Sequence, residues 1–563
     1  MTQLNVKNLD HLGIIAAVVD ELGLVDYINE QLQENDRAKI SAGLVVKAMI
    51  LNGLGFINSP LYLFSRFFED KPLEHLLGKG IKASDLNDDR LGRVLDLIFM
   101  AGISRLFVGI CLKAVEIFKI MMASAHLDSS SISVEGEYKL SVEREDKEDQ
   151  VIHITHGHSK DGRPDLKQFV LNLVCWGDGD IPAFLELGDG NQSDKKEFAE
   201  VLKRFNEQWQ FDGLYIADSA LYSADNLKKL TGIKWLCCVP KTIKSVQDLL
   251  TELASEQFIT TDLAGYRLTS VGNEYGGVKQ RWIVVESEQK KALDLKQLTK
   301  ATEKATAQAE KQLSQLQRQE FACREDALTA LSRWEKSLEL HHLEDLSVVE
   351  KCHYGHRGKP RLHEQPIRRS YHAQATLSLN MAKVELAERA AGRFVLATNQ
   401  LDGDSLSDEQ LLVHYKQQQG VERGFRFLKD PLFFASSVFL KTPERIMALS
   451  FIMVLCLLVY SLGQRKLRLA LAEQEETVPN PLGKPTQRPT LRWIFQMLRG
   501  VHWVVLDNCP QIINLTLERE RILRRVIASY LLQKIQTKRE KYSVKKKQSS
   551  KRRKGYYLKK VSE

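Results

Sequence analysis

Apolar and polar positions divide the chain into regions of different period. Up to about residue 120, apolar residues recur every three or four positions, as in HLGIIAAVVDELGLVDYINEQL, which predicts helices. After residue 123, short apolar runs bounded by turn residues predict strands at 125–134, 168–176, 182–188, 213–218 and 233–241, with helices at 194–209 and 223–232. A hairpin-linked group of strands followed by helical crossovers predicts a mixed sheet covered by helices.

A second pattern interrupts the first between about residues 242 and 400. Apolar runs on both sides of Gly276-Gly277 predict a hairpin. From Val278 to Tyr354 there is neither Gly nor Pro, and the helical step from Leu295 to Leu316 predicts a long amphipathic helix packed back on itself. Strands at 371–379 and 393–399 flank a helical segment, so we expect an α+β insertion here.

The last third of the chain predicts a helix over 407–428, an apolar run, a Pro-bearing linker over 473–489 and a final helical region. The apolar run, Ile446 to Leu462, has no charged residue and is close to the ~20 residues that cross a bilayer. A buried helix inside a large domain has the same composition. We favour the buried helix, and a membrane anchor is the alternative.

Charge is concentrated at one end of the chain. The 563 residues carry 80 Lys and Arg against 72 Asp and Glu, a net charge of +8. From Lys538 to Glu563 twelve cations face two glutamates, so this tail carries +10 and the rest sums to −2. A basic tail interleaved with tyrosines favours contact with DNA phosphates. The first residues do not resemble a secretory signal, and the eight cysteines form no CxxC pair, which indicates a reduced cytoplasmic protein; the expected contact with DNA would place it at the nucleoid.

Two aspartates belong to predicted strands: Asp128 sits within one, and Asp218 ends another. Asp128 follows His126-Leu127, and Asp218 follows Ile216-Ala217. A carboxylate at a strand end is held by a rigid sheet yet faces its rim, which suits metal ligation. A turn or helix cap is the more common explanation of a single such aspartate, and two in matching contexts make metal ligation about as good an interpretation.

The helix over 407–428 and its end carry a third polar group. At about 100° per residue, Tyr415, Gln418, Glu422, Arg426 and Lys429 fall within an arc of about 80°. One face thus presents a carboxylate among a hydroxyl, an amide and two cations. A solvated face with a Glu422–Arg426 pair is the simpler alternative.

Together these pieces resemble the RNase H-like DDE transposases of bacterial insertion sequences, in the branch with a Tyr–x2–Arg–x3–Glu–x6–Lys helix. Tyr415, Glu422 and Lys429 fall at that spacing, whereas Gln418 stands where the family usually has Arg; Arg423 or Arg426 could compensate. The loop GHSKDGRPDL, residues 157–166, is similar to a motif of this branch.

The resemblance implies a site and a reaction. Asp128, Asp218 and Glu422 would be catalytic and would bind two Mg²⁺ or Mn²⁺ ions, which cleave the ends of an element and join them to target DNA by hydrolysis and transesterification. The expected DNA contacts are Tyr415, Gln418, Arg423, Arg426, Lys429, Lys160 and Arg163. Pairing two ends implies a homodimer, and no membrane partner is expected.

The resemblance also implies an α/β fold: an RNase H-like mixed five-stranded sheet with helices, interrupted by the insertion. The expected segments are a helical amino-terminal domain that could bind DNA (1–120), the catalytic domain in two parts (121–241 and 401–465), the insertion domain (242–400), a helical carboxy-terminal region (466–536) and the basic tail (537–563).

Two other features are weaker evidence for a functional site. Cys352, His353 and His356 match no standard zinc spacing. Trp282 could stack on an unpaired base, and a core position is at least as good an interpretation. Two further functions stay open: a metal-dependent nuclease that never joins ends, and a DNA-binding protein derived from a transposase that has lost catalysis, which Gln418 favours.

Overall fold

The computed structural model describes residues 5–34, 38–56, 64–136, 138, 151–356, 358–359, 365–430, 440, 442–506 and 509–526. The predicted basic tail lies outside the described residues. The chain forms two compact units, Met1–Leu236 with Val413–Glu563, and Cys237–Leu412.

The first unit is built on a mixed sheet whose strands follow the order β4-β3-β2-β5-β6. Their bounds are β2 Ser124–Val134, β3 Lys167–Trp176, β4 Ile181–Gly188, β5 Leu214–Ala217 and β6 Trp235–Cys238. Strand β3 runs antiparallel to both β2 and β4, whereas β5 runs parallel to β2. Helices α8 (Asp194–Trp209) and α9 (Ala224–Lys229) make the crossovers. The predicted RNase H-like α/β fold is confirmed.

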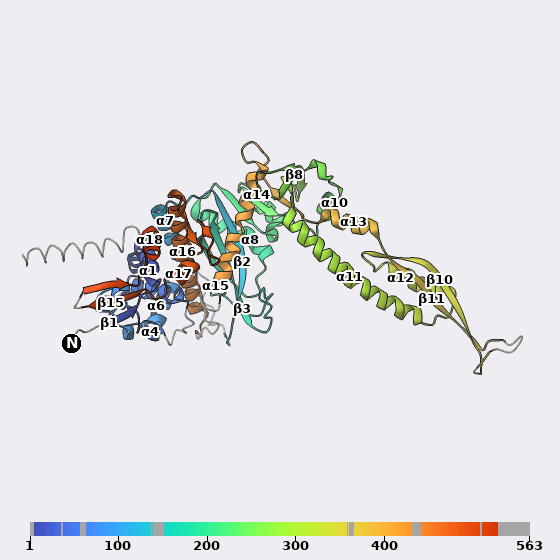
Figure 1. Ribbon diagram of the computed structural model, residues 1–563, viewed down its shortest axis with the longest axis horizontal. Helices are drawn as coiled ribbons and strands as arrows, with labels where there is room; N and C mark the ends of the chain where they lie inside the picture. Colours follow the sequence, from blue (N-terminus) through green and yellow to red (C-terminus); the bar gives the residue numbers. More distant parts are fainter. Residues whose placement is uncertain are drawn as a thin grey trace, which may run out of the picture. The chain divides into compact units, whose positions relative to one another are not determined.

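The helical part of this unit packs around one central helix, α16 (Pro443–Glu473) (Figure 1). Its neighbours are α1 Leu12–Glu21, α3 Ala42–Gly53, α6 Asp88–Met100, α7 Ile103–Phe118 and α18 Leu517–Val526, with α2 Leu24–Leu32 beside α3. By length and composition α16 could cross a membrane, but 89% of its most apolar window is buried inside the protein. That burial favours the core-helix interpretation of residues 446–462.

A small sheet joins the two ends of the described chain. Strand β1 (Asn5–Asn8) pairs antiparallel with β15 (His502–Leu506), which pairs with β16 (Cys509–Ile513). Three short elements lie between α16 and β15, namely β13 Val478–Pro479, β14 Pro485–Thr486 and α17 Leu491–Met497. The region expected to be helical after residue 466 contains α17 and α18 and also β15 and β16, which the sequence did not predict because β15 pairs with β1, a strand remote in sequence.

The second unit contains strands in the order β12-β9-β8-β7. Their bounds are β7 Ile259–Thr260, β8 Tyr266–Tyr275, β9 Val278–Ser287 and β12 Arg393–Thr398, accompanied by helices α10 Lys244–Glu252 and α13 Met381–Ala390. The predicted hairpin turn is confirmed, and Gly276 and Gly277 take the left-handed φ values of 62° and 78° that it requires. Trp282 is 2% exposed and its Nε1 donates to Gln280, so it is a core residue.

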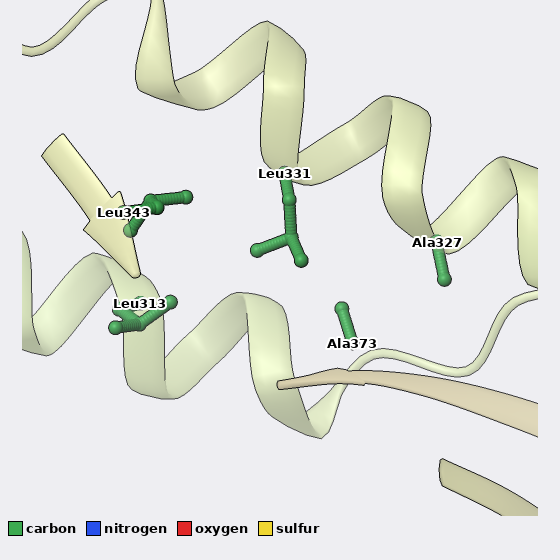
Figure 2. Close-up of a cluster of buried hydrophobic side chains, with 5 residues drawn as sticks. All are labelled: Leu313, Ala327, Leu331, Leu343 and Ala373. Carbon is green, nitrogen blue, oxygen red and sulfur yellow. The ribbon is translucent and has the colours of Figure 1, made fainter. Parts of the chain in front are cut away.

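The long helix of this unit is α11 (Glu288–Arg318), followed by α12 (Arg324–Glu335). The predicted long helix is thus present, and the same Gly- and Pro-free stretch also contains β10 (His341–His353), which pairs with β11 (Arg368–Leu379) and was not predicted. Leu313, Ala327, Leu331, Leu343 and Ala373 close a small core between these four elements (Figure 2). The absence of Gly and Pro did not exclude a strand, because Val348 and Val349 suit a ribbon with a partner.

Buried His11 should make this fold sensitive to acid. Its Nε2 lies 2.8 Å from the Leu54 carbonyl oxygen, and its ring stacks on Phe495 at 4.2 Å. Burial lowers the pKa of His11 to about 4; Asp10 opposes the shift, and Lys71 and Arg499 reinforce it. Between pH 6.5 and 4 the unfolded chain binds a proton that the folded chain does not, so stability falls as the pH falls through this window.

The expected loss from His11 is about 3 kcal/mol across that window. In urea unfolding, His11→Gln should flatten the dependence on pH between 6.5 and 4, and the same substitution at the exposed His158 is the control. An unchanged slope in His11→Gln would contradict the assignment.

Candidate active site

Asp128 lies inside β2, and Asp218 directly follows β5, the parallel neighbour of β2. Leu127 of β2 is in register with Ala217 of β5, so each aspartate follows a paired residue at the same level of the sheet. Asp128 Oδ1 accepts from the Ser129 amide at 2.8 Å, and Asp218 Oδ1 accepts from the Ala220 amide at 2.8 Å. The structure thus brings these two predicted residues together.

Glu422 lies close enough to Asp128 for its negative charge to raise the pKa of Asp128. Burial raises the pKa of Asp128 to about 7; Lys160 and the Ser129 amide oppose the shift, while Asp218 and Glu422 add to it. Burial likewise raises the pKa of Asp218. The predicted carboxylates therefore repel one another electrostatically in a partly desolvated place.

The helix predicted over 407–428 is divided at Gln418 into α14 (Asp408–Gln417) and α15 (Gln419–Leu428). Half-buried Tyr415 lies on α14, and Glu422 and Arg426 are exposed on α15. Gln418 itself is 5% exposed. The expected single polar face is therefore split, because one of its five members points into the protein.

Gln418 ties α15 to the strand that carries Asp128. Its Oε1 lies 3.1 Å from His126 Nδ1, and its Nε2 donates to the Leu127 carbonyl at 2.8 Å. His126 Nε2 lies 3.0 Å from the Ser124 hydroxyl. Burial lowers the pKa of His126 to about 4, so the ring is neutral and, with its proton on Nδ1, donates to Gln418. Both polar groups of the Gln418 side chain are thus bonded to β2, so they do not face a phosphate as predicted.

Further contacts fix α15 from both sides. Lys429 Nζ lies 2.7 Å from Asp161 Oδ1 in the loop 157–166, and Arg423 Nη2 lies 3.4 Å from Asp180 Oδ2. Gly420 allows this approach, since a Cβ there would stand 1.8 Å from Asp180. Among the predicted DNA contacts, exposed Arg426 has no ion pair within the described part of the chain.

The two cations predicted in the loop 157–166 are also paired. Lys160 Nζ lies 2.7 Å from Asp194 Oδ2 and 2.7 Å from the Ser129 carbonyl, with 36% of its side chain exposed. Arg163 forms an exposed pair with Asp165 at 2.8 Å. For Lys160 to contact DNA, bonds inside the site would have to break.

Sequence reasoning missed Asp194 and Ser129. The Ser129 hydroxyl donates to Asp194 Oδ1 at 2.6 Å, and the charge of Asp194 helps to raise the pKa of Asp218, after burial. Asp194 is the first residue of α8, where an acidic residue is ordinary. A polar Ser-Ser-Ser run inside an apolar strand was the available signal for Ser129.

The donor chemistry of the three predicted carboxylates fits a hard divalent cation. Their oxygens are the ligands that Mg²⁺ prefers, and a cation would relieve the repulsion that raises the pKa of Asp128. Within the described ranges, no three Asp, Glu, His or Cys side chains already stand as a ligand set, Cys352, His353 and His356 included. Glu422, the third predicted ligand, is exposed at the surface of α15.

Comparison with protein families decides the class. The family described as "Transposase DDE domain" matches residues 126–459, which is more than half of the chain. The chain belongs to the transposase DDE domain family. The match begins in β2, two residues before Asp128, and ends in α16, so it spans all three predicted carboxylates of this transposase. The DDE transposase family generally uses divalent metal ions.

Other comparisons add little to this assignment. A domain family of unknown function, DUF4277, matches residues 4–112 of the transposase. No curated protein matches it. A solved synaptic complex of piggyBac transposase with hairpin DNA is similar at 11% identity and a TM-score of 0.35, over 88% of this chain and 82% of that chain. A likeness this weak contributes nothing to the argument for function.

Proposed function

We propose that this transposase cleaves the ends of an insertion sequence and joins them to target DNA, with Asp128, Asp218 and Glu422 as its catalytic residues. The observation that carries the proposal is the parallel register of β2 and β5, which sets two aspartates side by side. The electrostatic effect of Glu422 on the pKa of Asp128 supports Glu422 as the third catalytic residue. DNA is the proposed partner, and pairing of two ends favours a homodimer.

The three carboxylates would hold two Mg²⁺ or Mn²⁺ ions. Bound there, the ions would activate the attacking oxygen and stabilise the leaving oxygen of the phosphodiester. The chain itself orients the carboxylates: the Ser129 amide holds Asp128, the Ala220 amide holds Asp218, and Gln418 anchors the helix of Glu422.

DNA contacts are proposed for the side chains around Glu422. Arg426 is exposed one turn beyond it, and Arg423 and Lys429 are held by single acidic partners. Tyr415 lies one turn before Gln418 on α14. A phosphate that replaced Asp161 or Asp180 as the partner of these cations would position the scissile strand beside Glu422.

A strand-transfer assay tests the function. Purified protein, Mg²⁺ and a duplex carrying the terminal repeats that flank the gene should yield cut ends, and pre-cut ends should become joined to a target plasmid. Cutting without joining would identify a nuclease. Specific binding of the repeats without either reaction would identify a DNA-binding protein that has lost catalysis.

A further inference from the structure

The solvent face of α11 carries a line of cations that the proposed active site does not use. They are Lys296, Lys300, Lys304, Lys311 and Arg318, and all five are exposed. Their spacings of four, four, seven and seven residues place them within an arc of about 80° at 100° per residue. We call these five residues the α11 basic stripe.

Packing on the other side of α11 fixes the direction of the stripe. Ala309 and Leu313 are 4% and 6% exposed, and Leu313 points into the core shared with α12, β10 and β11 (Figure 2). At 100° per residue these two side chains lie about 140–180° from the centre of the stripe. The cations therefore face solvent because the helix cannot turn without opening that core.

The stripe is not neutralised by its surroundings. Lys290 of the same helix pairs with Asp294 at 3.4 Å, whereas none of the five stripe residues has an ion pair among the described residues. Two exposed glutamates, Glu303 and Glu310, lie along one edge, leaving an excess of three positive charges. Small residues, Ala307 and Ser314, fill the gaps between the cations and permit close approach.

We propose that the α11 basic stripe binds the phosphate backbone of duplex DNA without reading its sequence. This proposal rests on the proposed function, which makes DNA the substrate. From Lys296 to Arg318 the helix rises about 33 Å, which is close to the 34–36 Å of one turn of the duplex. Lysine provides point charges for phosphates, and α11 has no aromatic residue on which unpaired bases could stack.

Salt dependence of DNA binding tests the stripe. The variant Lys296→Gln, Lys300→Gln, Lys304→Gln keeps good helix formers at exposed positions and should leave the melting temperature unchanged. With metal-free protein and a duplex of about 30 base pairs lacking the terminal repeats, the slope of log affinity against log salt should fall in magnitude by about 3, since each phosphate contact contributes about 0.9. Fluorescence anisotropy between about 50 and 200 mM salt measures it.

A matched control separates the stripe from general charge. Lys244, Lys279 and Lys336 are exposed lysines of the same unit that lie off the stripe, and their triple Gln variant removes the same charge. Equal losses in the two variants, an unchanged slope in the stripe variant, or a loss confined to RNA of the same length would each overturn the proposal. If the unaltered protein neither binds nor cuts DNA, the proposed function fails; if it does both and only the slope prediction fails, the stripe alone is wrong.

Discussion

Replacing Asp218 with Asn is expected to lower metal-dependent strand cleavage by roughly a thousandfold or more, because loss of a metal-binding carboxylate removes several kcal/mol of transition-state stabilisation. The amide keeps the shape of the side chain and can still accept from the Ala220 amide, so folding should persist. The same result is expected for Asp128→Asn and Glu422→Gln. Gel assays of end cleavage, with DNA binding measured in parallel, check it.

Stability measurements separate lost chemistry from lost folding. Burial chiefly raises the pKa of Asp128 to about 7. Between the ordinary pKa of an aspartate and pH 7, the metal-free folded chain keeps a proton that the unfolded chain has lost, so its stability falls as the pH rises through this window. Asp128→Asn should therefore be at least as stable as the unaltered protein in chelator at pH 8. Asp212→Asn, at a side chain that is 93% exposed in the same unit, is the control and should keep activity. Cleavage retained by Asp218→Asn or Glu422→Gln would refute the site.

Gln418→Ala is expected to reduce cleavage by roughly 10–100-fold, since a displacement of about 1 Å at a reacting group can cost a hundredfold. The change leaves the Leu127 carbonyl and His126 Nδ1 without partners in the core and frees α15, one turn before Glu422. The same loss should lower the free energy of unfolding by about 1–3 kcal/mol. Single-turnover cleavage and urea unfolding measure the two effects.

The neighbouring position provides the matched control for Gln418. Gln419 is exposed, so Gln419→Ala should change neither quantity. Gln418→Arg is a second informative variant, because it restores the residue usual in the resembling branch. With Gln418 buried against β2, the larger cation should destabilise the protein rather than activate it. Higher activity in Gln418→Arg would show that this position faces DNA.

Local pattern was enough to predict most of the catalytic sheet. The period-two and continuous apolar runs of β2 to β6 and the helical step of α8 lie close to their observed bounds, because each buries a face that its own sequence marks. Strands β10, β15 and β16, whose own sequences carry no clear strand pattern, were missed. β10 pairs with β11 across fifteen or more residues, and β15 pairs with a strand almost five hundred residues earlier.

The candidate site was predictable only in part for the same reason. Asp128 and Asp218 could be proposed because their apolar strands are visible in sequence, and Glu422 because its helix carries the spacing of the family it resembles. The break at Gln418 could not be predicted, since Gln418 bonds there to His126 and Leu127, which are remote in sequence. Nor could the pairing of Lys160 with Asp194, which depends on the bonds that hold Lys160 against β2.

The position of α16 has a consequence for biosynthesis. Helices α1, α3, α6 and α7 surround a helix that the ribosome makes more than three hundred residues later, and Arg445 and Lys466 of that helix supply the partners of Asp96 and Glu21. A nascent chain therefore carries its amino-terminal helices with exposed apolar faces until residue 473 has emerged. Premature termination anywhere before α16 should yield an aggregation-prone fragment in place of a free-standing amino-terminal domain.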